Sequence, residues 1–186
     1  MNQTASDALE PYRQYLKILA ELHLDRRLRG KLDASDVVQQ TFLRAYSAFN
    51  GLRQREPEVL AAWLRKILAS TLADALKHYE RDKRDIGLER SLQRDLDRSV
   101  DGFSGLAASQ TSPSQHAERT EELLKLVDAL AQLPDLMREV VILKHCRGWT
   151  LEQIAEQLDK TRPAVASLLR RGLEKLREEM KSTEGT

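Results

Sequence analysis

Apolar residues recur at three- and four-residue intervals over most of the chain, and this spacing predicts helices. Over residues 8–84 we predict three helices. The first starts near Pro11 and stops at Gly30. Asp33 caps the second, and the third follows Pro57. The expected buried positions are Leu16, Leu19, Leu22, Val37, Val38, Thr41, Phe42, Ala45, Phe49, Leu60, Trp63, Leu64, Ile67, Leu68, Leu72 and Leu76.

The pattern weakens over residues 85–117. This stretch contains several glycines, many serines and a proline, and its apolar residues show little periodicity. Such a composition is typical of a flexible connection, and one transient helix over 88–96 is the only regular element we expect in it. The predicted fold is therefore all-α, with two small helical domains at 8–84 and 118–180 joined by a flexible linker.

Helical spacing returns at Glu118 and continues to the end of the second domain. One helix is predicted from the apolar positions Leu123, Leu126, Val127 and Leu130. Pro134 opens the next helix, whose apolar positions are Met137, Val140, Val141 and Leu143.

Two further short helices carry the most informative pattern in the chain. Thr150 can cap the first, and Gln153 completes a capping box three residues later. Residues 159–160 form a tight break, after which Thr161 can cap the second helix and Pro163 lies in its first turn. The apolar positions of the pair are Leu151, Ile154, Ala155, Leu158, Val165, Leu168, Leu169 and Leu176. Such a pair resembles a helix-turn-helix that presents its second helix to DNA.

The second helix of this pair, residues 162–177, has the composition of a recognition helix. It carries five basic residues and one acid, Glu174, and small residues near its start allow close approach to base edges. Gly172 costs about 1 kcal/mol relative to alanine inside a helix, so we predict a close helix contact there. The alternative is a helical hairpin with a solvated basic face. The residues expected outside the buried face are Arg162, Ala164, Ala166, Ser167, Arg170 and Arg171.

The first domain carries a polar stripe and a strongly basic segment. Asp36, Gln39, Gln40 and Arg44 lie near one another at helical spacing. The basic segment combines loop arginines with cations on the third helix, a set suited to flipped bases and strand backbones. Trp63 is more consistent with a core position than with a stacking platform. The basic residues are Arg53, Arg55, Arg65, Lys66, Lys77, Arg81, Lys83 and Arg84.

Composition narrows the function. A net charge of +1 gives no global attraction to nucleic acid, so DNA affinity must come from local clusters. The single cysteine, Cys146, excludes an internal disulfide and is expected in the core of a cytoplasmic protein. We expect no membrane insertion, because no leader or long apolar run is present. The four histidines lack metal-ligand spacing, and no nucleotide-binding or nucleophile motif occurs, so we expect neither an enzyme nor a cofactor.

Taken together, the two blocks resemble a sigma factor of the extracytoplasmic-function (ECF) type in the sigma-70 family. DVVQQTFLRA at 36–45 is similar to the region 2 helix that grips core RNA polymerase. WLRKIL at 63–68 is similar to the start of the helix that faces the −10 promoter element. Residues 133–177 resemble region 4, which binds the −35 element and the β flap of polymerase.

The resemblance implies a transcription initiation factor with three kinds of contact. Polymerase-binding residues on the clamp coiled coil of the β′ subunit would be Asp36, Gln39, Gln40 and Arg44. Residues at the −10 element would be Asn50, Arg53, Arg55, Trp63, Arg65, Lys66, Lys77 and His78, with the 50–55 loop capturing a flipped base. Residues at the −35 element would be Arg162, Ala164, Ser167, Arg170 and Arg171.

The chain departs from the family pattern at a few positions. Gln40 stands where an acid is usual, and Ala166 and Leu168 replace polar or basic residues of the recognition helix. Two other functions therefore stay open. A sigma-like adaptor would bind an anti-sigma factor without initiating transcription. A free-standing helix-turn-helix regulator would bind duplex DNA by itself, as a dimer on symmetric half-sites.

Overall fold

A computed structural model describes residues 3–24, 32–48, 56–79, 86–110 and 119–183, and all the regular elements in these ranges are helices. The chain divides into two compact units, Met1–Asp97 and Arg98–Thr186. The predicted all-α, two-domain class is confirmed. Among the described helices, none combines the length and the apolar character that crossing a membrane requires.

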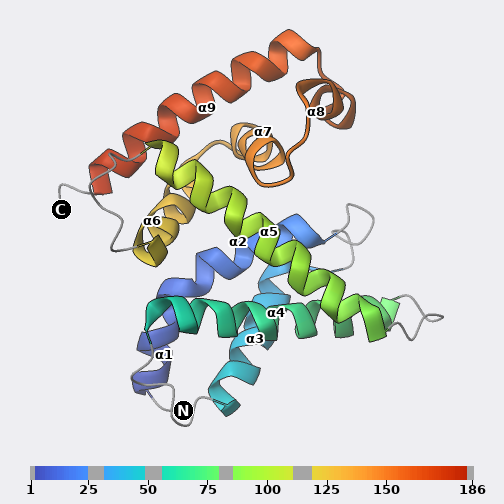
Figure 1. The fold of residues 1–186 in the computed structure, drawn as a ribbon, viewed down its shortest axis with the longest axis vertical. Coiled ribbons are helices and arrows are strands. Elements are labelled where there is room, and N and C mark those ends of the chain that lie inside the picture. Colours follow the sequence, from blue (N-terminus) through green and yellow to red (C-terminus); the bar gives the residue numbers. More distant parts are fainter. Residues whose placement is uncertain (1–2, 25–31, 49–55, 80–85, 111–118, 184–186) are drawn as a thin grey trace. The chain divides into compact units, whose positions relative to one another are not determined.

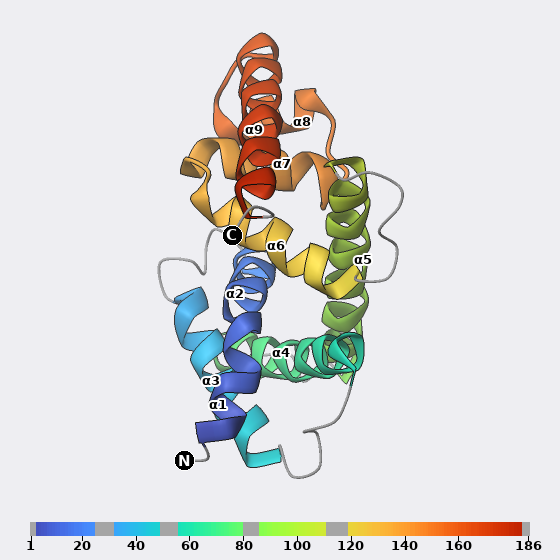
Figure 2. The same ribbon diagram turned by 90° about the vertical axis from the view of Figure 1, so that its left-hand side faces the viewer.

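Unit 1 is built around three packed helices. The 3-10 turn η1, Glu10–Tyr12, joins α1, Gln3–Leu9, to α2, Arg13–His23. Helix α3, Ala34–Ala48, and helix α4, Pro57–Tyr79, pack against each other and against α2. Figures 1 and 2 show α4 running across α2 and α3.

The predicted helix starts in unit 1 are partly confirmed. Pro11 lies inside η1, so the helical segment begins before the position that we predicted. Asp33 does cap α3, because its Oδ1 accepts a hydrogen bond from the Ser35 N–H at 2.8 Å. Gly30 and Phe49 lie outside the described residues. The predicted positions that are only half-buried are Trp63, Ile67 and Leu76, and the other described ones are buried.

Residues 86–110 differ from the flexible connection that we predicted, because they form one helix, α5, Ile86–Gln110. Its buried side chains recur at helical spacing. They are Leu92, Leu96, Ser99, Phe103, Leu106 and Ala107. Residues up to Asp97 belong to unit 1, and the rest of the helix belongs to unit 2.

Glycine has a packing role in α5. A Cβ atom on Gly102 would lie 2.6 Å from the backbone oxygen of His145 and 2.8 Å from the Cα of Cys146. The backbone of α5 therefore approaches the end of α7, Asp135–His145, at a distance that only glycine permits. The serines and glycines that suggested a flexible connection belong to a packed helix.

Unit 2 contains α6, Arg119–Gln132, α7, α8, Leu151–Leu158, and α9, Arg162–Thr183. Helix α9 packs against each of the other three, and α8 lies beside its first turns (Figure 1). The predicted close contact at Gly172 is confirmed, since a Cβ there would lie 3.0 Å from Cγ2 of Val141. Cys146 is buried as expected, and burial raises the pKa of its thiol to about 12.

The two glycines of α5 provide a matched prediction. Gly102→Ala should lower the free energy of unfolding, because the clash with backbone atoms outweighs the gain in helix propensity. Gly105→Ala should raise it by about 1 kcal/mol, since no atom lies within 4 Å of the added methyl group. Urea unfolding of both variants checks the contrast. Equal stabilisation by the two alanines would contradict the close approach at Gly102.

Candidate DNA- and polymerase-binding surfaces

The turn between α8 and α9 is built by local hydrogen bonds. The capping box at Thr150 is confirmed: Gln153 N–H donates to Thr150 Oγ1 at 3.2 Å, and Thr150 N–H donates to Gln153 Oε1 at 2.8 Å. Asp159 ends α8 in the left-handed region, with φ of 50°. Thr161 Oγ1 then accepts from Ala164 N–H at 3.4 Å, which confirms the predicted cap of α9.

A small apolar cluster fixes α8 against α9. Its buried members are Val140, Ile154, Ala155 and Val165. The partly buried side chains packed against it are Leu143, Trp149, Leu151, Leu158, Leu168 and Leu169. Leu168 thus contributes to packing, which explains why an apolar side chain stands within the predicted recognition helix. The cluster leaves the opposite side of α9 to solvent.

The basic residues predicted at the −35 element lie on that exposed side. Arg162, Arg170 and Arg171 are exposed, while the small residues Ala164 and Ser167 are half-buried. Two of the arginines have acidic partners that the sequence did not suggest as pairs. The Nε group of Arg162 donates to Oε1 of Glu152, and Nη1 of Arg170 donates to Oε1 of Glu174 at 2.8 Å.

The polar stripe on α3 is also solvent-facing. Asp36, Gln39 and Gln40 are exposed, whereas Arg44 is half-buried and forms an ion pair with Asp74 of α4 at 2.9 Å. Leu43, which was not among the predicted site residues, is 52% exposed and lies beside the two glutamines on the same helix. Its spacing of four residues from Gln39 and three from Gln40 could have placed it on the polar stripe from the sequence alone.

The residues predicted at the −10 element lie only partly within the described ranges. Lys66 and Lys77 are exposed on α4, and Trp63 is half-buried. Lys77 lies 3.9 Å from the carboxylate of Asp74. Asn50, Arg53 and Arg55 lie outside the described residues, as does the side chain of His78.

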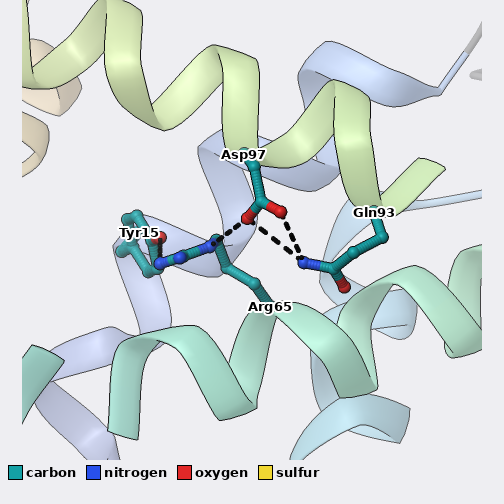
Figure 3. A network of polar contacts seen from close by, with 4 residues as sticks. All are labelled: Tyr15, Arg65, Gln93 and Asp97. Atoms are coloured by element: carbon teal, nitrogen blue, oxygen red, sulfur yellow. Dashed lines mark hydrogen bonds and ion pairs between the residues drawn. The ribbon is translucent and has the colours of Figure 1, made fainter. Parts of the chain in front are cut away.

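Arg65 differs from the prediction, because its side chain is largely buried in a polar network (Figure 3). Its Nη1 donates to the hydroxyl of Tyr15 on α2 at 2.9 Å, and its Nε donates to Asp97 Oδ1 on α5 at 3.0 Å. Gln93 donates to both oxygens of the same carboxylate. Burial raises the pKa of the Tyr15 phenol to about 12, against the opposing effect of the Arg65 charge.

The geometry of Arg65 indicates a structural role. Only 16% of its side chain is exposed, and its hydrogen bonds join α4 to both α2 and α5 within unit 1. A guanidinium held in this way has little surface left for a phosphate. The sequence could not reveal this, because its partners lie 50 and 32 residues away along the chain.

The two units thus define a helical protein with a helix-turn-helix in the second unit, and comparison with known proteins gives its family. The sequence pattern of sigma-70 region 2 matches residues 12–82, and that of sigma-70 region 4 matches residues 123–176. The region 2 match contains α3 and α4, and the region 4 match contains α7, α8 and the first part of α9.

Several relatives resemble the chain over most of its length. The RNA polymerase sigma factor CarQ of Myxococcus xanthus is 32% identical over 159 residues, covering 83% of this chain and 79% of CarQ. The ECF RNA polymerase sigma factor SigG of Mycobacterium tuberculosis is 29% identical over 177 residues, covering 90% of this chain. The chain spans about half of SigG, 46% of its length. The chain belongs to the ECF group of the sigma-70 family.

The network at Arg65 can be tested against its neighbour. Arg65→Met should lower the free energy of unfolding by about 1–3 kcal/mol, because it leaves Tyr15 and Asp97 without a charged hydrogen-bond donor. Lys66→Met removes the same charge from the next, exposed position and should change stability by less than about 0.5 kcal/mol. Chemical denaturation measures both. Similar small effects would show that the network contributes little.

Proposed function

We propose that this chain is a transcription initiation factor that binds core RNA polymerase and directs it to specific promoters. The observation that carries the proposal is the presence, on one chain, of a region 2 unit and a region 4 unit that each leave a polar face exposed. Polymerase would supply the catalysis. This protein would supply promoter recognition and strand opening.

The recognition helix α9 is proposed to bind the −35 element. Its exposed arginines can contact phosphates, and its small residues near the start allow the helix to approach base edges. The ion pairs of Arg162 and Arg170 reduce the positive charge of this face in the free protein. We therefore expect the free chain to bind DNA weakly and to bind more tightly when polymerase holds both units on one promoter.

The exposed face of α3 is proposed to bind the β′ clamp coiled coil. Asp36, Gln39 and Gln40 offer hydrogen-bonding groups, and Leu43 adds an exposed apolar side chain of the kind that interfaces bury. Lys66 and Lys77 on α4 are proposed to contact the −10 region, together with the 50–55 loop. Arg65 is not included, since its guanidinium is committed inside unit 1.

The direct test uses purified core polymerase. The protein should form a complex with core that survives size-exclusion chromatography, and the complex should give run-off transcripts from a subset of promoters in a genomic library. Absence of any transcript that depends on the protein would refute the proposed function. Binding of an anti-sigma factor without binding of core would favour the adaptor instead.

The polymerase contact predicts a specific loss of affinity. Gln39→Ala combined with Leu43→Ala should weaken binding to core about tenfold or more, because both groups lose contact area at the centre of the interface. Val59→Ala is the matched control, since Val59 of α4 is similarly exposed, at 42%. Fluorescence anisotropy of the labelled protein with core measures the affinities. Equal effects of both variants would remove α3 from the interface.

The DNA contact predicts a change in salt dependence. Arg170→Ala with Arg171→Ala should reduce the slope of log affinity against log salt by about 1–2, because fewer counterions are released when phosphate contacts are lost. The measurement is promoter binding by the complex with core at several salt concentrations. A slope equal to that of the unmodified protein would place these arginines away from DNA.

A further inference from the structure

An ion pair links the first turns of the two helix-turn-helix elements. The Nε group of Arg162, at the start of α9, donates to Oε1 of Glu152 in the first turn of α8. Both side chains are more than 60% exposed. Exposed pairs contribute little to stability, so stability alone gives little reason for this contact.

The surroundings of Glu152 favour its charged form. Its own backbone N–H, the Arg162 guanidinium and the Thr150 side chain lower the pKa of Glu152. The carboxylate also lies at the positive end of the α8 dipole. Glu152 is therefore a charged acceptor near the N-terminus of α8.

The contact fixes the orientation of the arginine while leaving its terminal groups available. A guanidinium is planar, so a hydrogen bond at Nε orients the whole group. Nη1 and Nη2 of Arg162 make no hydrogen bond to the described part of the chain. Arg170 differs, because one of its terminal nitrogens already donates to Glu174.

The charge of the pair indicates what the arginine can recognise. Glu152 partly neutralises Arg162, so the pair attracts a phosphate less strongly than an unpaired arginine does, and the same is true of Arg170 beside Glu174. Two parallel N–H donors match the O6 and N7 acceptors that guanine presents in the major groove. The start of a recognition helix is the part that reaches base edges in such motifs.

We propose that Arg162 reads a guanine of the −35 element through its two terminal nitrogens, and that Glu152 is the positioning residue that orients it. The inference rests on the proposed function, which it deepens by assigning one base contact.

Arg171 has no acidic partner among the described side chains and donates from Nε to the Ser167 carbonyl at 3.5 Å. It therefore keeps the positive charge that a phosphate contact uses.

The test measures base preference with the complex of this protein and core polymerase. Transcription is assayed on a promoter library in which the −35 positions are randomised. The unmodified protein should prefer guanine at one position, and Arg162→Ala should reduce that preference by roughly 5- to 150-fold, the range for one bidentate contact. The preferences at the other positions should persist.

The Glu152 variants separate positioning from a general electrostatic effect. Glu152→Ala should weaken the guanine preference at the same position, and Glu152→Gln, which keeps an acceptor, should retain part of it. Glu156→Ala, at another exposed acid of α8, should leave the preference unchanged. Circular dichroism and thermal unfolding check that each variant is folded.

Other outcomes would overturn the inference. If Glu152→Ala strengthens binding equally on all sequences, the glutamate acts as a competitor of phosphate. If both Glu152 variants weaken binding equally on all sequences, it has only a structural role in the turn. If the unmodified protein gives no promoter-dependent transcript, the proposed function itself fails, and this result is distinct from a loss of guanine preference.

Discussion

The candidate DNA-binding surface depends on one constraint, which is the burial of the apolar side of α9 against α6, α7 and α8. Val165 and Leu176 are fully buried, and Gly172 between them lets α9 approach the side chain of Val141. A helix held along this length cannot rotate without exposing apolar groups to water. Its arginines therefore face solvent in a fixed register, and base recognition needs such a register.

The same packing explains the sequence of the recognition helix. Leu168 and Leu169 occupy positions that the apolar cluster needs, so the number of side chains available for DNA is small. A small number of DNA-contacting side chains can be enough for recognition when each is held in a suitable orientation. Under the proposed function, region 2 would share promoter recognition with α9, which reduces what α9 must supply alone.

Local patterns predicted those parts of the structure that local chemistry determines. The caps at Asp33, Thr150 and Thr161 depend on residues within three positions, and all three are present. The apolar faces of α3, α6 and α8 follow helical spacing in the same way. For the candidate site, the sequence identified the exposed arginines of α9 and the polar stripe of α3 but not their acidic partners.

The features that the sequence did not predict depend on distant contacts. Arg65 looks like a DNA-binding cation until Tyr15 and Asp97 are placed beside it. Gly102 looks like a linker residue until the end of α7 is placed against it. Composition describes what a segment prefers in isolation, and tertiary packing overrides that preference.

Helix α5 has a consequence for how the protein unfolds. One continuous run of backbone hydrogen bonds crosses the boundary between the units at residues 97–98, with Leu96 buried on one side and Phe103 on the other. Breaking a helix in its middle creates two new ends and loses the cooperativity of the helix–coil transition. A break at this boundary would therefore cost more free energy than fraying at either end of α5, so we expect its central turns to lose their backbone hydrogen bonds last.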